Sequence, residues 1–393
     1  MKALTTKAKC LIAISAATAL CGVLSSSAVA DGGNGITGLT VRNVAPARYF
    51  PATDDRNHVE FDLVVTNALR TDATLKTLVV RTGSRTVLKL SGDALARITH
   101  PVSLGLLTPT ATIAPAGSVV VLVDVKLRGS VRGLPRRLSS SIRYSVAPGP
   151  LSTIVDNNVV ALKTKVDGRL PRVIAPPLRG TGWLGLNACC DPDGSHRSGL
   201  LAIDNRLTMI EAFAIDYERI VNGSVVSGDG SRLTDFYGYG EPIHSVARGK
   251  VVAVHKGMPD APWPVGPPNL TVKTSADFTG NSVIVKIGTG QYALYAHMKP
   301  DSIRVREGQR LRTGQVIGLL GNSGNSFGPH LHFAIQSAPR PFARSVPYVF
   351  DRFKLEGTAE IDPSGSGAVA IRGPARQMRR VYPRAGEVTA YER

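Results

Sequence analysis

Two histidines separated by a single residue, His330 and His332, carry the clearest chemistry in this sequence. Side chains alternate between the two faces of a β-strand, so residues i and i+2 point the same way. Apolar residues follow His332 and continue a strand, so the pair would place two imidazoles side by side. Neutral imidazole is the commonest metal ligand, and catalytic zinc sites use three protein ligands with a fourth position open. This pair therefore predicts half of a metal site.

A carboxylate in a second strand is a candidate partner for the histidine pair. Asp216 stands among apolar residues in the alternating run Phe-Ala-Ile-Asp-Tyr, residues 213–217. A buried aspartate is costly unless it is paired or bound to a cation, so metal ligation would explain it, with a backbone-capping role as the alternative. The third ligand would be His196, in a Gly-Ser loop, with His244 and His255 as weaker alternatives.

The elements that must position these residues are strands. Short runs of β-branched and apolar residues, many with period two, recur on both sides of a stretch rich in proline and arginine. Helical periodicity is nearly absent, so we predict a mainly β protein with a small β-sandwich at its N-terminal side. The predicted parts are a β-sandwich-like domain (31–165), a Pro/Arg-rich linker or surface strap (166–182), a second strand-rich domain (183–353) and a loosely ordered basic C-terminal extension (354–393).

Nothing in the predicted N-terminal domain indicates catalysis. Its two histidines, His58 and His100, stand alone in the sequence. A lone histidine is more often a surface or capping residue than a metal ligand, and we predict that role for both.

The first thirty residues predict an export signal. Three lysines precede an apolar run of small residues, and Ala-Val-Ala at residues 28–30 fits an A-x-A cleavage site. The run is too short and too rich in Ala, Ser and Thr for a membrane anchor. We therefore predict a signal peptide over residues 1–30, an exported protein that is periplasmic or secreted, and no transmembrane segment after cleavage.

The remaining cysteines are an adjacent pair, Cys189 and Cys190, because the other two lie within the predicted signal peptide. One pair excludes a scaffold stapled by several disulfides. A vicinal bridge, pairing with another chain and free thiols all remain open.

The chain is strongly basic, with a formal net charge of +18. Loss of the three lysines of the signal peptide would leave 18 − 3 = +15. Such a charge attracts anionic partners over a long range. For an exported protein these are anionic cell-envelope polymers, and we expect no nucleic-acid partner.

Several sequence blocks in the C-terminal half occur in the order and spacing of a known family. Residues 240–335 resemble the catalytic domain of the lysostaphin-type, or LytM-type, zinc metalloendopeptidases, peptidase family M23. The blocks are Gly-Glu-Pro-Ile (240–243), Val-Ala-Arg-Gly-Lys-Val-Val (246–252), Gly-Asn-Ser-Val-Ile-Val (280–285), Tyr-Ala-Leu-Tyr-Ala-His (292–297), Val-Arg-Glu-Gly-Gln (305–309), Gly-Gln-Val-Ile-Gly (314–318), Gly-Asn-Ser-Gly-Asn-Ser (321–326) and Gly-Pro-His-Leu-His-Phe (328–333).

The resemblance implies an antiparallel β-sheet peptidase domain and a site with one Zn²⁺ per chain. Asp216 and His332 would be metal ligands, and His297 and His330 would be the catalytic pair over the scissile bond. In the commonest family pattern the first ligand is a histidine four residues before the aspartate, but this chain has Ala212 there. It resembles instead a branch with an upstream His-Arg, in which His196 would complete the site; the two adjacent cysteines are a remote alternative.

These features predict an exported zinc-dependent metalloendopeptidase, most simply one that hydrolyses peptide bonds in peptidoglycan stems or cross-links. A basic surface suits an anionic cell wall. The alternative is a catalytically inactive relative that binds the wall or regulates another hydrolase, and the missing histidine at Ala212 is its best support. A third hypothesis is an adhesive β-protein with a closed structural zinc site, in which His297 would have to be a ligand.

Overall fold

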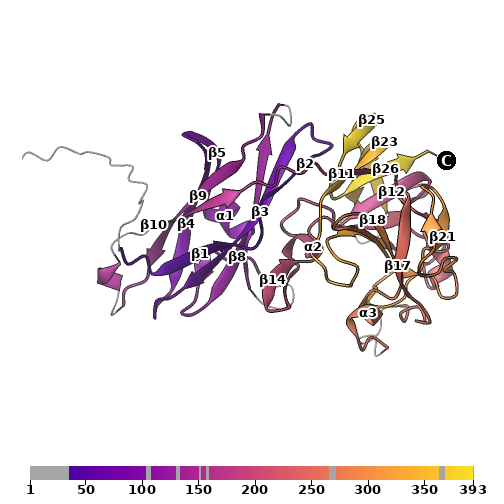
Figure 1. Ribbon diagram of the computed structural model, residues 1–393, viewed down its shortest axis with the longest axis horizontal. Coiled ribbons are helices and arrows are strands. Elements are labelled where there is room, and N and C mark those ends of the chain that lie inside the picture. Colours follow the sequence, from indigo (N-terminus) through magenta and orange to yellow (C-terminus); the bar gives the residue numbers. More distant parts are fainter. Residues whose placement is uncertain are drawn as a thin grey trace, which may run out of the picture. The chain divides into compact units, whose positions relative to one another are not determined.

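Strands dominate the computed structural model of this protein, and the prediction of a mainly β fold is confirmed (Figure 1). The structure describes residues 35–102, 108–129, 133–149, 152–155, 159–264, 271–362 and 368–392. Among the described strands every pairing is antiparallel except that of β11 with β23. The helical segments within these ranges are the short pieces α1 (Gly92–Arg97), η2 (Ser152–Ile154), α2 (Ser195–Ser198), η3 (Leu233–Asp235) and α3 (Ser275–Phe278).

Two five-stranded sheets form the N-terminal part of the described chain, which we call the two-sheet region. They share one apolar core, to which β3 contributes Val59, Phe61 and Leu63 at alternate positions. The first sheet contains β1 (Leu39–Asn43), β2 (Arg48–Pro51), β3 (Asn57–Asn67), β6 (Thr99–Pro101) and β8 (Ser118–Leu127); the second contains β4 (Ala73–Thr82), β5 (Arg85–Ser91), β7 (Thr112–Ile113), β9 (Arg137–Val146) and β10 (Val159–Lys165).

A twelve-stranded sheet forms the rest of the core, with ten strands in the order β11-β23-β26-β12-β15-β22-β19-β18-β17-β20 and β24 and β25 paired with β23. These strands are β11 (Arg172–Ile174), β12 (Gly180–Leu186), β15 (Ile215–Arg219), β17 (Gly249–His255), β18 (Asn281–Gly288), β19 (Gln291–Met298), β20 (Arg310–Leu311), β22 (Leu331–Gln336), β23 (Tyr348–Ile361), β24 (Val369–Arg372), β25 (Arg376–Val381) and β26 (Glu387–Tyr391). Two small ribbons join β13 (Leu200–Ile203) to β14 (Arg206–Met209) and β16 (Pro242–His244) to β21 (Val316–Leu319).

Strand β3 is buried on both of its faces. Its odd-numbered residues face the core of the two-sheet region, whereas Val64 belongs to the apolar cluster that also contains Trp183 and Phe333 of the large sheet. The even-numbered residues on the second face include His58, Glu60 and Asp62, all buried. This strand therefore carries charged groups into the contact with the large sheet.

The expectation of a loosely ordered C-terminal tail is wrong. Residues 354–393 contribute the end of β23 and the strands β24, β25 and β26, and β26 lies between β23 and β12 inside the large sheet. Tyr382 and Val388 are fully buried in this segment. Its many arginines suggested an exposed extension, but in β25 they are exposed residues of a paired strand that buries Met378. Part of the predicted linker is also a strand, since β11 pairs with β23.

Two smaller expectations can be compared with the structure. Cys189 and Cys190 form a vicinal disulfide, one of the alternatives that the sequence left open. His58 is not a surface residue, because it is fully buried between Asp54 and Asp124. The predicted signal peptide lies outside the described residues. No helix in the described ranges is long and apolar enough to cross a membrane.

Candidate metal centre

The predicted pair Asp216 and His332 meets across two neighbouring strands. Strands β15 and β22 are antiparallel, and their register places Asp216 directly opposite His332. His332 Nδ1 lies 2.9 Å from Asp216 Oδ1. Both side chains are buried, and their strands also contribute Ile215, Tyr217 and Phe333 to the apolar core. The sheet therefore fixes a carboxylate oxygen and an imidazole nitrogen at one point.

His196 reaches the same point from a loop. It lies in the four-residue helix α2, and its Nε2 is 3.1 Å from Asp216 Oδ2. Its other ring nitrogen, Nδ1, lies 3.3 Å from the carbonyl oxygen of Ala214, which turns Nε2 toward the carboxylate. Ala212, where the commoner pattern has a histidine, is buried. The loop thus brings the His196 imidazole to Asp216 in place of the histidine that is absent at position 212.

The donor set of His196, Asp216 and His332 fits a divalent transition metal. One ligand atom from each residue lies within 4.8 Å of the others, and all three side chains are buried. Two imidazole nitrogens and a carboxylate oxygen are ordinary zinc ligands. Within the described residues the structure thus offers three converging donors for one ion.

The charges of the metal-free centre are strongly coupled. Burial alone would lower the pKa of His196, but the neighbouring Asp216 carboxylate raises that pKa to about 9. Burial would raise the pKa of Asp216, but His196 and His330 hold it well below its usual range. The carboxylate is therefore ionised and has a protonated imidazole as its partner when no metal is bound.

The two predicted catalytic histidines stand beside this donor set. The ring centroids of His297 and His330 are 4.7 Å apart, and those of His297 and His332 are 5.9 Å apart. His330 Nε2 lies 3.6 Å from Asp216 Oδ1. All five predicted site residues are thus brought together in one cluster.

Backbone carbonyls orient both catalytic candidates. His297 Nδ1 donates to the carbonyl oxygen of Ser323 at 2.8 Å, and His330 Nδ1 donates to that of Gly328 at 2.8 Å. A carbonyl only accepts, so each Nδ1 carries the hydrogen and each Nε2 presents a lone pair. Burial, together with the neighbouring histidines, lowers the pKa of His297 well below its usual range, and burial also lowers the pKa of His330. Both imidazoles are therefore neutral.

The backbone around His297 has an uncommon conformation. His297 has φ 58°, in the left-handed region that few residues other than glycine adopt. Gly280 stands beside it with φ +60°, and a Cβ there would lie 2.3 Å from the carbonyl oxygen of Ser323. That carbonyl holds the His297 ring, so the absence of a side chain at Gly280 preserves the orientation. Strained residues of this kind cluster at functional sites.

Several supporting contacts were not predicted from the sequence. Asn187 Nδ2 donates to Asp216 Oδ2 at 2.9 Å, and no motif in the sequence singled out this asparagine. The Ser323 and Gly328 carbonyls were also missed, although both lie in family-like blocks. Of the alternative ligands, His255 pairs with Asp277 at 3.0 Å, and the bridged cysteines offer no thiolate.

A cleft opens beside the cluster on the side of His297 and His332. Among the residues that line it are Glu211, Phe278, Thr279 and Phe342. The cleft is small, with room for about one water molecule, and it borders both His332 and His297. A metal site of this type next to a cleft is typical of hydrolases that use a metal ion.

The comparisons with known proteins agree with this class. Residues 232–343 match the family described as Peptidase family M23. The chain therefore contains a domain of peptidase family M23, as the sequence blocks predicted.

Curated proteins that match part of this chain include two whose names describe endopeptidases. Peptidoglycan DD-endopeptidase ShyA of Vibrio cholerae is 37% identical over 109 residues, covering 25% of this chain and 24% of that protein. DD-carboxypeptidase/endopeptidase Mpg of Neisseria meningitidis is 38% identical over 72 residues, covering 18% and 16%. The catalytic domain of lysostaphin from Staphylococcus simulans is a structural neighbour with a TM-score of 0.23 and 17% identity, covering 44% of this chain and 88% of that one. The match spans about a quarter or less of these curated relatives' length.

Proposed function

We propose that this protein is an exported zinc metalloendopeptidase that hydrolyses peptide bonds in peptidoglycan stems or cross-links. The observation that carries the proposal is the convergence of His196, Asp216 and His332 next to two neutral histidines with free Nε2 atoms. The names of the relatives support the substrate class. Action outside the cytoplasm follows from that substrate.

His196, Asp216 and His332 would hold the zinc ion. When bound, zinc supplies a Lewis acid that polarises the scissile carbonyl and makes water more acidic. His330 Nε2 takes a proton from the attacking water as the carbon–oxygen bond forms, and returns it to the leaving nitrogen as the carbon–nitrogen bond breaks. His297 is also neutral, so its Nε2 accepts a hydrogen bond and holds the water from a second side; donation to an oxyanion would need its protonated form.

The proposal is tested with purified peptidoglycan sacculi. The full chain is stripped of metal and then reconstituted with Zn²⁺, and the new amino termini released from the sacculi are counted for both preparations. We expect release only with zinc. A protein that binds one zinc ion per chain and releases no amino termini would instead be the inactive, wall-binding or regulatory alternative that Ala212 suggested.

Zinc binding is expected to release about one proton near pH 7, because the raised pKa of His196 leaves its imidazole protonated in the metal-free protein. Zinc affinity should therefore rise about tenfold per pH unit until the pH approaches 9. Calorimetry in buffers of different ionisation enthalpy measures the proton, and His196→Gln, which has no such proton, is the control.

The raised pKa of His196 also affects the stability of the metal-free protein. The folded pKa of His196 lies above its ordinary value of 6.5, so the stabilisation from this group is complete below pH 6.5 and is lost as the pH rises through about 9. Chemical denaturation of the metal-free chain at pH 6 and pH 9 measures the contribution of His196 to the free energy of unfolding. Equal contributions at the two pH values would contradict the ion pair between His196 and Asp216.

A further inference from the structure

The loop that carries His196 is held by the two-sheet region. The residue after His196, Arg197, is only 2% exposed. Its Nη1 donates to Asp62 Oδ1 at 2.6 Å, and its Nε lies 3.2 Å from Glu60 Oε1. Both carboxylates come from β3, two residues apart and hence on one face of the strand. The guanidinium next to a candidate ligand therefore finds its counter-charges in the other region of the molecule.

Asp62 is the principal counter-charge of Arg197. The Asp62 contact with Arg197 is the shorter of the two, and burial raises the pKa of Glu60 to about 8 against the opposing effect of Arg197. A buried cation that loses its partner is strongly destabilised. The Arg197–Asp62 contact is therefore a firm attachment between α2 and β3.

A second contact fixes the same loop. Arg97, at the end of α1 in the two-sheet region, contacts Asp191 at 2.9 Å and Asp193 at 2.7 Å, just before α2. These pairs are solvent-exposed and add little by themselves. A four-residue helix has too few hydrogen bonds of its own to hold a side chain. On the side of the large sheet, the His196 ring contacts Asp216, the Ala214 carbonyl and the ring of His332.

We infer that the two-sheet region is part of the metal centre: Asp62 and Glu60 hold Arg197, and Arg197 positions His196 as the third ligand. Arg197 is a positioning residue and touches neither substrate nor metal. The inference rests on the proposed function, because it assigns His196 to zinc. It gives the N-terminal region a role in the chemistry in addition to any role in targeting.

The test measures zinc affinity of the full chain by competition with a chelator, at a temperature where each variant is folded. Arg197→Met keeps the apolar stem and removes the guanidinium. We expect its zinc affinity to fall by roughly 10–100-fold, the range typical of partners that orient a metal ligand. Co²⁺ substitution gives a second readout, because the visible absorption of Co²⁺ changes when a nitrogen ligand is lost.

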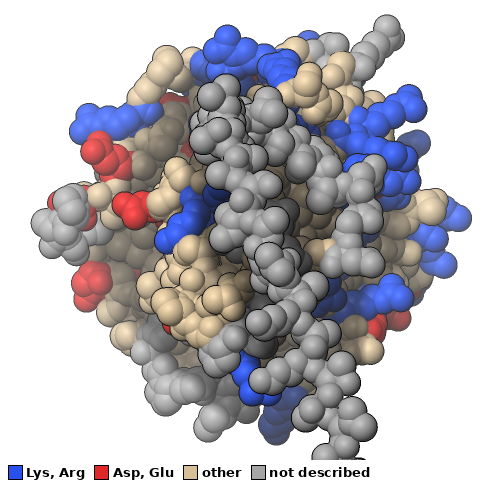
Figure 2. Space-filling model, turned by 90° about the vertical axis from the view of Figure 1, so that its left-hand side faces the viewer, with Lys and Arg blue, Asp and Glu red and all other residues tan. Residues whose placement is uncertain are grey.

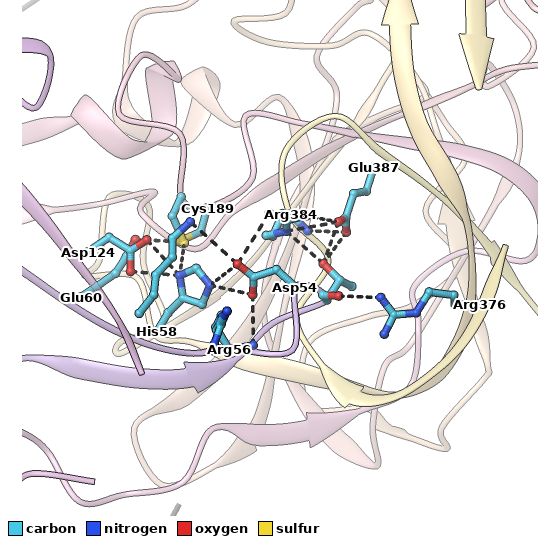
Figure 3. A network of polar contacts seen from close by, with 12 residues as sticks. Asp54, Arg56, His58, Glu60, Asp124, Cys189, Arg376, Arg384 and Glu387 are labelled. Carbon is cyan, nitrogen blue, oxygen red and sulfur yellow. Dashed lines mark hydrogen bonds and ion pairs between the residues drawn. A yellow bond between two sulfur atoms is a disulfide. The ribbon is translucent and has the colours of Figure 1, made fainter. Parts of the chain in front are cut away.

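Two controls distinguish a positioning role of Arg197 from a general loosening of the contact between the two-sheet region and the large sheet. Arg384 also lies where the regions meet, bound to Glu387 at 3.0 Å and near Asp54; these partners are not residues of α2, although the polar network continues from Asp54 through His58 to Glu60 (Figure 3). Arg384→Met should leave zinc affinity unchanged. In a His196→Ala background, Arg197→Met should cause no further loss, because its effect passes through the missing imidazole.

The outcomes distinguish this inference from the proposed function. If the wild type binds zinc and Arg197→Met binds it as tightly, or if the loss persists in the His196→Ala background, the positioning role is wrong and the function stands. If the wild type binds no zinc, the proposed function itself fails.

A different observation concerns the second sheet of the two-sheet region. Its strands β4, β5, β9 and β10 contain eight Lys or Arg residues and no Asp or Glu. Seven are exposed and Arg81 is half-buried, and none forms an ion pair within the part of the chain that the structure describes. Lys165 stands directly opposite Arg137, a like-charge pair that destabilises the sheet. The eight residues, which we call the basic sheet face, are Lys76, Arg81, Arg85, Lys89, Arg137, Arg143, Lys163 and Lys165.

The composition of this sheet restricts the kind of partner. The one aromatic residue in these four strands is Tyr144, which is buried in the core. No aromatic ring of these strands is therefore available to stack on nucleic-acid bases. No large apolar side chain in the four strands is exposed for insertion into a membrane. Figure 2 views the molecule from the left of Figure 1, where these strands lie, and shows Lys and Arg side chains around that side. We propose that the basic sheet face binds an extended phosphate-bearing polymer of the cell envelope by charge.

The probe for this surface is polyglycerol phosphate, with binding measured at low and high salt. The variant Arg137→Glu/Lys163→Glu/Lys165→Glu should weaken binding by roughly tenfold or more at low salt, because the attraction is electrostatic and salt-dependent. The matched control, Arg306→Glu/Arg310→Glu/Arg312→Glu, changes three exposed arginines near β20 and should have little effect. Equal loss in both variants would overturn the assignment, as would tighter binding to anionic lipid vesicles or single-stranded DNA.

Discussion

Replacing Asp216 by asparagine is expected to remove stoichiometric zinc and all measurable hydrolysis. Asp216 contacts His196, His332 and Asn187 and lies near His330, so one carboxylate organises the entire centre. Asparagine keeps the shape but supplies no charge, leaving the imidazoles without an anion. The loss of affinity should exceed the roughly 10–100-fold typical when a partner of a ligand is changed.

Metal analysis of the purified variant, together with counting of amino termini released from sacculi, measures this effect. The control is Asp204→Asn, the same substitution at an exposed carboxylate that pairs with Arg340. Retention of one zinc ion per chain by Asp216→Asn would exclude this carboxylate as a ligand.

His330→Ala is expected to lower kcat by roughly 10²–10⁴-fold, the usual contribution of a general base, while zinc stays bound. His330 carries a neutral ring whose Nδ1 is held by Gly328, and its free Nε2 faces the donor set. Removal of the ring takes away the proton acceptor and leaves His196, Asp216 and His332 in place.

Kinetics on a defined muropeptide, with zinc content measured on the same sample, tests this role. His244→Ala is the comparison, since His244 lies on the β16–β21 ribbon outside the five-residue cluster. Equal turnover by wild type and His330→Ala would remove His330 from the mechanism. Loss of zinc together with activity would show that His330 is a ligand instead.

The strand chemistry of the site was predictable because it depends on local periodicity. An alternating strand places His330 and His332 on one face, and an aspartate among apolar residues identifies Asp216. His196 could be named only through a family resemblance, because its position depends on a loop and not on a strand register. No sequence pattern connects Arg197 with Asp62, since 135 residues separate them.

The C-terminal strands were missed for a related reason. Alternation identifies a strand but not its neighbours. The run Arg-Gln-Met-Arg-Arg-Val of β25 is dominated by charge, and only Met378 is buried. Charged residues are common on exposed edges of sheets, where they prevent further pairing. The charged composition of β25, which suggested a loosely ordered tail, therefore also fits a strand at the exposed edge of a sheet.

The position of β26 has a consequence for how the protein folds. This strand lies between β23 and β12, and β12 is the neighbour of the strand that carries Asp216. β26 follows Asp216 by more than 160 residues, so the sheet around the site stays open until synthesis reaches residues 387–391. Contacts of such long sequence separation form late in folding. The metal site of the proposed peptidase would therefore lie in a complete sheet only after residues 387–391 have paired with β12 and β23.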